Sequence, residues 1–304
     1  MKVLLFTHKI DIDGIGNAVL ANLAFDEVDV EYLETFEVDD VFEEFYANKK
    51  FDFYSNVFIT DICICESNLE LIDGDKNLRD KIKIFDHHKN NFKRDYEFCN
   101  IKIKDEKGLC CGTSLFYQYL LNNNYLKPTK TLVEFVELTR QYDTWEWKDI
   151  YNNTLANDLN LIFVATDRNY YLQKMLECIK KCDIFQLKQE ENAIIENYKK
   201  EIAAGVERLI DKIIEQNIDG KSVAVIASAE NKYRNEVSEV LKNRGAKFDY
   251  LVMVINDRDT ISLRSINEEI DVAEIAIKLG GKGHKKASSV SKTKDNLKYF
   301  KVEN

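Results

Sequence analysis

The sequence predicts an α/β protein with an N-terminal, mostly parallel sheet flanked by helices, a helical linker, and a smaller C-terminal α/β domain with a mixed sheet. Three observations support this prediction. The chain has 304 residues, enough for about two domains. In the first half, short apolar strands alternate with helix-length segments. A second α/β pattern begins after a long helical stretch.

The strands predicted in the first half are short and apolar or alternate with a period of two, as strands in a covered sheet do. They are residues 3–8, 28–33, 56–64 and 81–86. The helices predicted between and after these strands are residues 14–24, 112–121 and 130–141, the last of which follows Pro128. Strands separated by helix-length segments predict βαβ units and parallel pairing.

Apolar residues between about 171 and 216 recur every three or four positions, as in Ile202, Val206 and Ile210. This stretch is either one long helix or a pair of helices. Beyond it we expect strands at 222–228, 248–256 and 260–264, with a hairpin around residues 257–259, and helices at 236–243 and 271–279. The predicted domains are residues 1–170, a linker at 171–218, and residues 219–304.

Composition excludes several classes of protein. No apolar run approaches the roughly 18 residues that a membrane helix needs, and the N-terminus does not resemble a signal peptide. The seven cysteines form an odd set without paired zinc-ligand spacing, so we expect free thiols and a cytoplasmic location. The net charge of −10 argues against a non-specific binder of duplex DNA.

Acidic and imidazole side chains follow three of the predicted strands. His8 ends the first, with Asp11 and Asp13 after it, Asp61 follows the apolar residues 57–60 of the third, and the run 86–88 (Asp-His-His) closes the fourth. Ligands in open α/β sheets gather at the carboxyl ends of the strands. Imidazole with carboxylate is a ligand set suited to manganese, iron or zinc. The sequence therefore predicts a metal site at this edge.

These segments resemble the first three motifs of the DHH phosphoesterase superfamily. Asp143, within the run 140–147 (RQYDTWEW), resembles the fourth motif. Residues 280–288 (GGKGHKKAS) resemble the glycine–histidine signature of the DHH-associated C-terminal domain. The resemblance covers nearly the whole chain, and the RQYDTWEW run is most similar to bacterial oligoribonucleases of this superfamily. It identifies residues 1–170 as the catalytic domain and residues 219–304 as the substrate-binding domain.

The resemblance implies a phosphodiesterase with two divalent metal ions, most often Mn²⁺, that activate a water molecule. One ion would be bound by His8 and Asp11, with Asp61 bridging to the other. The ligands of the second ion would be Asp13, His87 and Asp143. His88 would face the scissile phosphate, and Asp86 would support the imidazole pair. The spacing between His8 and Asp11 differs by one residue from the spacing in the usual motif. This difference affects mainly the assignment of Asp11 as a metal ligand.

The C-terminal domain would hold the rest of the nucleotide. The residues that the resemblance assigns to this role are Ser262, Arg264, Gly281, Lys282, Gly283 and His284. Glycines let backbone N–H groups approach a phosphate, and arginine can bind it bidentately. Lys282 stands where the family has a glycine, so it either strains the turn or adds a cation. Residues 221–304 contain 16 basic and 12 acidic residues, in contrast to the acidic remainder.

The function implied is hydrolysis of short oligoribonucleotides to nucleoside monophosphates. Alternatives are a cyclic- or linear-dinucleotide phosphodiesterase and a catalytically silent nucleotide-binding module. The expected partner is a short single-stranded RNA or a dinucleotide. We expect no binding to a membrane or to stable duplex DNA. A homodimer is compatible with the sequence. Trp145 and Trp147 could stack on bases, but we favour packing in the core that positions Asp143.

Overall fold

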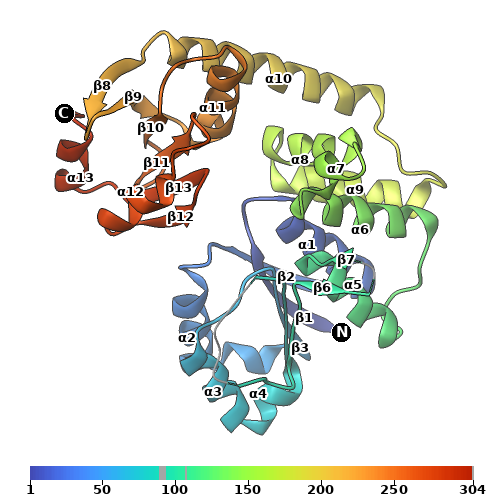
Figure 1. The fold of residues 1–304 in the computed structure, drawn as a ribbon. Helices are drawn as coiled ribbons and strands as arrows, with labels where there is room; N and C mark the ends of the chain where they lie inside the picture. The colour runs from blue at the N-terminus through green and yellow to red at the C-terminus, as the bar shows by residue number, and fades with distance from the viewer. Residues whose placement is uncertain (89–93, 107, 303–304) are drawn as a thin grey trace. The chain divides into compact units, whose positions relative to one another are not determined.

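The computed structural model describes residues 1–88, 94–106 and 108–302. The chain forms two compact units, Met1–Ile195 and Glu196–Asn304. The boundary between them falls inside helix α10 (Gln189–Ile210), which Figure 1 shows as a long, continuous helix. In the described part of the chain, no helix is both long enough and apolar enough to cross a membrane.

The first unit contains a parallel sheet with the strand order β2-β1-β3-β4-β5. All four neighbouring pairs in this sheet are parallel, which confirms the predicted parallel sheet. Its strands are β1 (Lys2–His8), β2 (Glu27–Leu33), β3 (Asn56–Thr60), β4 (Ile82–Asp86) and β5 (Cys99–Ile101). A separate antiparallel pair is formed by β6 (Lys104–Asp105) and β7 (Gly108–Leu109).

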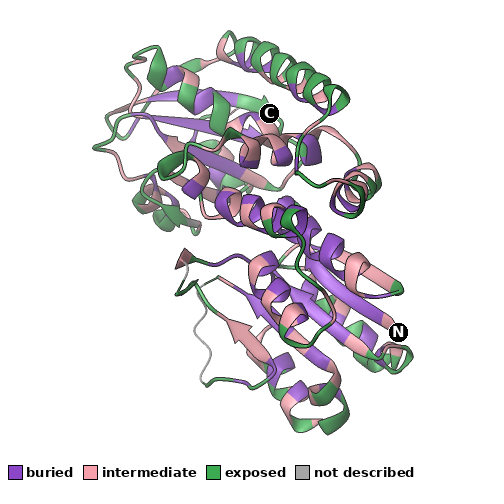
Figure 2. Ribbon diagram, turned by 90° about the vertical axis from the view of Figure 1, so that its right-hand side faces the viewer, coloured by how far each residue is buried: buried purple, intermediate pink, exposed green. Residues whose placement is uncertain are grey.

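Helices cover both faces of this sheet because successive strand residues point to opposite sides. Val3 and Leu5 of β1 enter one apolar core, whereas Leu4 and Phe6 enter the other. The central strands β1, β3 and β4 are mostly buried, and Figure 2 shows purple strands with helices on both sides of the sheet. The helical elements of this unit are α1 (Ile12–Ala24), α2 (Val38–Ala47), η1 (Lys50–Phe53), α3 (Glu66–Gly74), α4 (Lys76–Lys81), α5 (Gly112–Asn122), α6 (Lys130–Asp143), α7 (Glu146–Asp149), α8 (Thr154–Ala165) and α9 (Arg168–Lys181).

The long periodic stretch is a pair of helices, α9 and α10, rather than one helix. Its end differs from the prediction, since Ile214–Ile218 forms strand β8 instead of continuing the helix. β8 pairs with β9 in antiparallel register, with Ile214 opposite Val225. Pairing with a neighbouring strand outweighed the local helical spacing at this point, as tertiary context commonly does.

The second unit contains a mixed sheet with the strand order β12-β13-β11-β10-β9-β8. β9 and β10 are parallel and the other neighbours are antiparallel, which confirms the predicted mixed sheet. The remaining elements are β9 (Lys221–Ala229), η2 (Asn231–Tyr233), α11 (Arg234–Asn243), β10 (Tyr250–Ile255), β11 (Thr260–Ser265), α12 (Val272–Lys278), β12 (Lys282–His284), β13 (Ala287–Ser291) and α13 (Lys294–Tyr299).

Candidate metal centre

Three adjacent strands of the parallel sheet end in polar side chains at one edge. β1 ends at His8, and the turn after it leads into α1, with Asp11 as the N-cap and Asp13 in the first turn. Asp61 follows β3 directly, and Asp86 is the last residue of β4. β1, β3 and β4 are parallel neighbours, so these carboxyl ends lie together, where α/β proteins bind ligands.

The first cluster consists of His8, Asp11 and Asp61, whose ligating atoms lie within 4.8 Å of one another. The Nδ1 atom of His8 is 3.5 Å from Oδ2 of Asp11 and 3.5 Å from Oδ2 of Asp61. Its Nε2 atom faces Oε2 of Glu34 at 3.9 Å. The sequence analysis missed Glu34. Like Asp61, Glu34 is an acidic residue directly after a strand, β2, and this position could have identified it.

The second cluster consists of Asp13, His87 and Asp143. The Nε2 atom of His87 lies 3.3 Å from Oδ2 of Asp143 and 3.9 Å from Oδ2 of Asp13. The same nitrogen is 3.3 Å from Oδ1 of Asp61. One oxygen of Asp61 therefore faces the first cluster and the other faces the second, as a bridging carboxylate does.

A left-handed backbone conformation places Asp61 between the clusters. Its φ is 60°, a region that Asp tolerates better than most residues do. Its backbone N–H donates a 2.9 Å hydrogen bond to the carbonyl oxygen of Phe85 on the neighbouring strand. The chain thus turns sharply at the end of β3, and the buried carboxylate is held at the sheet edge.

The N-terminus of α5 holds Asp13. The backbone N–H of Gly112 donates to one carboxylate oxygen of Asp13 at 2.7 Å, and that of Thr113 donates to the other at 2.8 Å. A Cβ atom on Gly112 would lie 2.8 Å from Cβ of Asp61, so only glycine fits without displacing neighbours. The sequence analysis recognised this helix but did not connect Gly112 and Thr113 with the site.

Asp86 organises the residues that follow β4. Its Oδ1 atom accepts hydrogen bonds from the backbone N–H groups of His87, at 2.8 Å, and His88, at 3.3 Å. It also lies 2.8 Å from Nδ1 of His88, which raises the pKa of that imidazole. Ligating atoms of these three residues and Asp61 also lie within 4.8 Å of one another. The contact with Asp86 engages Nδ1, and not Nε2, of the exposed His88 ring.

The clusters concentrate negative charge in a buried place. Burial raises the pKa of Asp61 well above the usual range, and the charge of Asp13 raises it further. Burial and the charge of Asp13 also raise the pKa of Asp143. Burial by itself would lower the pKa of His8, but hydrogen bonds and charges from Asp11 and Asp61 outweigh it and raise this pKa to about 10.

Three buried ligand atoms have no hydrogen-bond partner among the described residues: Oδ2 of Asp61, Nε2 of His87 and Oδ2 of Asp143. A buried polar atom without a partner costs free energy, and a cation would satisfy all three. Imidazole nitrogen and carboxylate oxygen are also the donors that Mn²⁺, Fe²⁺ and Zn²⁺ accept. The residues present therefore fit divalent metal binding.

A buried arginine fixes the end of helix α6, where Asp143 lies. Arg140 donates from Nε to Glu137 at 2.9 Å and from Nη1 to the carbonyl oxygen of Leu109 at 3.0 Å. It also pairs with Glu146 on α7. Besides the pair within α6, the contacts of Arg140 with β7 and with α7 hold the end of α6 in place on both sides of Asp143.

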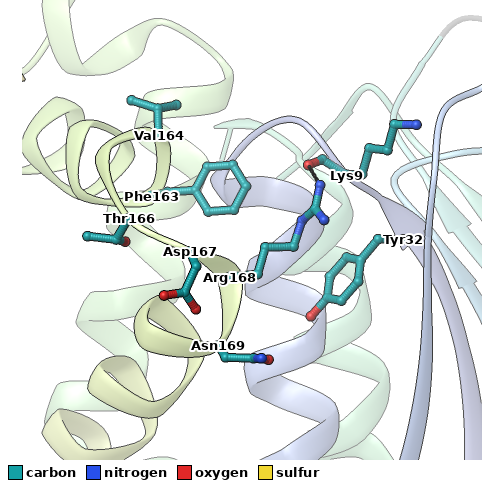
Figure 3. Close-up of a pocket in the computed structure, with 8 residues that line it drawn as sticks. All are labelled: Lys9, Tyr32, Phe163, Val164, Thr166, Asp167, Arg168 and Asn169. Atoms are coloured by element: carbon teal, nitrogen blue, oxygen red, sulfur yellow. Dashed lines mark hydrogen bonds between the residues drawn. The ribbon is translucent and has the colours of Figure 1, made fainter.

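A second arginine reaches the turn that carries the first cluster. Figure 3 shows a surface pocket of about 600 Å³, in which Arg168 of α9 extends past Tyr32 to Lys9. The Nη2 atom of Arg168 donates a 2.9 Å hydrogen bond to the carbonyl oxygen of Lys9, and the guanidinium lies 5.0 Å from the ring centre of Tyr32. The ammonium of Lys9 in turn pairs with Glu37 at 2.9 Å. These contacts hold the residue next to His8 from two sides.

In the second unit, Ser262 and Arg264 lie two residues apart on β11, and so on one face of the strand. Arg264 donates to the side-chain oxygen of Asn235 from two nitrogens, each at 3.2 Å. Burial, together with the charge of Arg234, lowers the pKa of Arg264 to about 10. The hydroxyl of Ser262 is buried and has no partner in the described chain.

The glycine–histidine segment forms β12 and pairs with β13, which pairs with β11. Lys282 and Ser262 are both opposite Ser289, so the segment and β11 share one part of the sheet. Gly283 has a φ of 148°, and a Cβ there would lie 2.4 Å from Cα of Ser288. A Cβ on Gly281 would also meet the backbone, whereas His284 is exposed. The side chain of Lys282 lies outside the described part of the structure.

No family model matches the chain. The oligoribonuclease NrnB of Bacillus subtilis (strain 168) is 30% identical to it over 303 residues, which cover 98% of this chain and 75% of NrnB. The chain belongs to the NrnB family of DHH phosphoesterases. This confirms the superfamily resemblance of the five motif segments.

Solved structures of DHH proteins share the fold. Exonuclease RecJ bound to manganese matches with a TM-score of 0.62 and 14% identity, covering 99% of this chain and 88% of RecJ. The pGpG-specific phosphodiesterase PggH from Vibrio cholerae matches with a TM-score of 0.56 and 13% identity, covering 99% of this chain and 96% of PggH. At these identities the likeness shows the fold alone.

The unusual first-motif spacing does not remove Asp11 from the site of this DHH phosphoesterase. Asp11 caps α1, where its side chain accepts a hydrogen bond from the backbone N–H of Gly14 at 3.3 Å. Its other oxygen still faces His8. Asp11 therefore keeps its place beside His8 in the turn whose residue Lys9 contacts Arg168 and Glu37.

Proposed function

We propose that the chain is a divalent-metal-dependent phosphodiesterase that degrades short oligoribonucleotides to nucleoside monophosphates. The observation that carries this proposal is the position of Asp61, with one oxygen toward His8 and the other toward His87. A carboxylate shared between two histidine–aspartate clusters suits a pair of cations rather than one. NrnB, which aligns with 98% of this chain, is named an oligoribonuclease, and this supports the choice of substrate.

In this proposal His8 and Asp11 hold one ion, and the other lies in the second cluster. The ligands of the second ion are Asp13, His87 and Asp143, with Asp61 shared between the two. Manganese is the ion we favour, since the donor set suits it and a RecJ structure of the same fold contains it. When bound, such ions acidify a water molecule and stabilise the negative charge of a phosphate.

The protein's own groups would position the substrate. Asp86 accepts a hydrogen bond from Nδ1 of His88 and raises the pKa of this imidazole, so the protonated ring can donate from Nε2 to a phosphate oxygen. Gly112 and Thr113 fix the Asp13 carboxylate, which keeps the second cluster in place before substrate binds. The contacts of Arg140 likewise keep the end of α6, and with it Asp143, in place before substrate binds.

In the second unit we propose that the β11–β13–β12 region binds the rest of the nucleotide. The unpartnered hydroxyl of Ser262 and the exposed His284 would be donors there, and the guanidinium of Arg264 would pair with a phosphate. The backbone at Gly281 and Gly283 has no Cβ to obstruct it. We also propose Lys282, whose side chain lies outside the described part of the structure, as a substrate-binding residue.

The decisive experiment is a cleavage assay over substrate length. Purified protein is incubated with labelled RNA from dimer to pentamer, a longer RNA, matched DNA and a cyclic dinucleotide, each with Mn²⁺, Mg²⁺ or a chelator. We expect nucleoside monophosphates from the short RNAs with metal and no product with chelator. Absence of cleavage with every metal would refute the proposal and favour a silent binding module.

The same assay separates the alternative substrates. Cleavage of the cyclic dinucleotide in preference to linear RNA would assign the site to cyclic-dinucleotide hydrolysis. Activity restricted to the RNA dimer would assign it to linear dinucleotides, the class to which PggH belongs by its name.

A further inference from the structure

Trp145 lies two residues after Asp143 and does not pack in the core. Its side chain is 55% exposed, whereas Trp147 is half-buried and packs against the main core of the first unit. The expectation that both tryptophans fill the core is therefore wrong for Trp145 and right for Trp147. Exposing so large an aromatic side chain forgoes the stabilisation that its burial would provide.

The backbone at Trp145 is also costly. Its φ is 63° and its ψ is 2°, a left-handed conformation that is an outlier for a bulky aromatic residue. Glycine or asparagine would adopt this turn with less strain. Strained residues of this kind cluster at functional sites, where the surrounding structure keeps them in place.

The surrounding turn is held from several directions. The N–H of Trp145 donates to the carbonyl oxygen of Tyr142 at 3.1 Å, and its own carbonyl accepts from Lys148 at 3.1 Å. Arg140 links α6 to Glu146 on the other side of Trp145. The ring centre of Trp147 lies 6.5 Å from that of Trp145, with the ring planes tilted by 30°. The exposed indole is thus presented from a rigid support next to a candidate metal ligand.

We propose that Trp145 is a stacking residue for a nucleobase of the oligonucleotide substrate. This inference rests on the proposed function, which places a phosphodiester at Asp143. A base is attached to the sugar next to that phosphate, and an exposed aromatic ring in the turn directly after Asp143 can stack on the face of that base. Every base has such a face, so this contact binds short RNAs without selecting a sequence.

The test compares substrates with and without the base. Kinetic constants are measured for an RNA dimer and for its abasic analogues, with the wild type, Trp145→Ala and Trp145→Phe. We expect Trp145→Ala to raise KM for the normal dimer by roughly 5- to 100-fold. The Trp145→Phe variant should restore most of this loss. An analogue that lacks the stacked base should be cleaved equally well by wild type and Trp145→Ala.

The matched control is Phe53→Ala. Phe53 is an aromatic residue with 75% exposure, but it precedes β3 and so belongs to the amino end of the strand rather than to the carboxyl end where the clusters lie. Its removal should leave KM for both substrates unchanged. Circular dichroism and size-exclusion chromatography of each variant monitor folding and self-association.

Several outcomes would overturn the inference while leaving the proposed function intact. One is an unchanged KM of Trp145→Ala for the normal dimer. Another is an equal loss with normal and all abasic dimers, which would make Trp145 a support of the turn that carries Asp143. A change of oligomeric state in Trp145→Ala alone would show that a second copy covers the residue.

If the wild type cleaves no substrate, the proposed function fails. A binding measurement then tests whether Trp145 stacks on a nucleobase. In Trp147→Phe, Trp145 is the remaining tryptophan of the two in the chain. Quenching of its fluorescence by adenosine monophosphate, but not by ribose 5-phosphate, would support base stacking. Equal effects of the two compounds, or none, would refute it.

Discussion

The Nε2 atom of His87 lies 3.3 Å from Oδ2 of Asp143, and neither atom has a hydrogen-bond partner among the described residues. The two residues come from a turn after β4 and from the last position of α6. Two buried ligand atoms brought together and left without partners are best explained by a cation between them.

Replacing His87 with alanine should remove the second metal site. Removing a metal ligand reduces activity more than removing a residue that only supports a ligand, which typically costs about 10- to 100-fold. Activity should therefore fall by more than about 100-fold. Metal content measured by plasma mass spectrometry should drop, while circular dichroism should show the wild-type fold. Wild-type metal content in this variant would contradict the assigned ligand role.

The metal-free protein should lose stability as the pH rises. The pKa values of Asp61 and Asp143 are raised by burial, and that of His8 is raised by its acidic neighbours to about 10. A group with a raised pKa stabilises the fold below its unfolded pKa and loses this contribution as pH rises through the folded value. For His8 the window runs from 6.5 to about 10.

Saturating Mn²⁺ should reverse this trend, because metal binding requires deprotonated ligands. At a metal concentration of about 100 times Kd the gain is about 2.7 kcal/mol. Thermal unfolding with chelator and with Mn²⁺ over this pH window measures both effects. Identical pH profiles for the two samples would contradict a cation site at these residues.

The Gly112→Ala substitution should disturb both clusters. The added Cβ would lie 2.8 Å from Cβ of Asp61 and 3.0 Å from Oδ2 of Asp13. Overpacking of this kind costs about 1–3 kcal/mol, and a displacement of about 1 Å can reduce activity about 100-fold. The control is Gly74→Ala, since no atom lies within 4 Å of a Cβ at that helical position. Denaturant unfolding and turnover of an RNA dimer are measured for both variants.

Arg168→Ala should weaken the first metal site. Without the hydrogen bond from Arg168 to Lys9, the turn between His8 and Asp11 loses a fixed point, and metal affinity should fall about 10- to 100-fold. The control is Arg94→Ala, because Arg94 also lies over a tyrosine and donates a hydrogen bond, to Asp73. Calorimetric titration with Mn²⁺ measures the affinity, and an equal affinity in both variants would count against the positioning role.

His284→Ala should affect substrate rather than metal. A lost hydrogen bond to a charged phosphate corresponds to a rise in KM of about tenfold or more. Metal content should stay at the wild-type value, because His284 is in the second unit and outside the clusters found among the described residues. A loss of bound metal in this variant would place His284 among the ligands instead.

Local patterns were sufficient to predict much of the fold and the outline of the site. The apolar alternation of β1, β3 and β4 predicted the parallel sheet, and each strand is followed by the residues predicted to meet there. His8, Asp61 and His87 could be found because a strand end is a local feature of the chain. β8 was missed, since its pairing with β9 is not encoded in its own periodicity.

The sequence by itself determined which strands end in acidic and imidazole groups, because strand periodicity and chain order are local properties. Only the tertiary structure decided how these groups are held. The support of Asp13 by Gly112, of Lys9 by Arg168 and of Asp143 by Arg140 depends on how helices dock against the sheet. The exposure of Trp145 also depends on a left-handed turn that neighbouring helices impose. Such contacts join distant segments, and their energies come from packing and burial rather than from local preference.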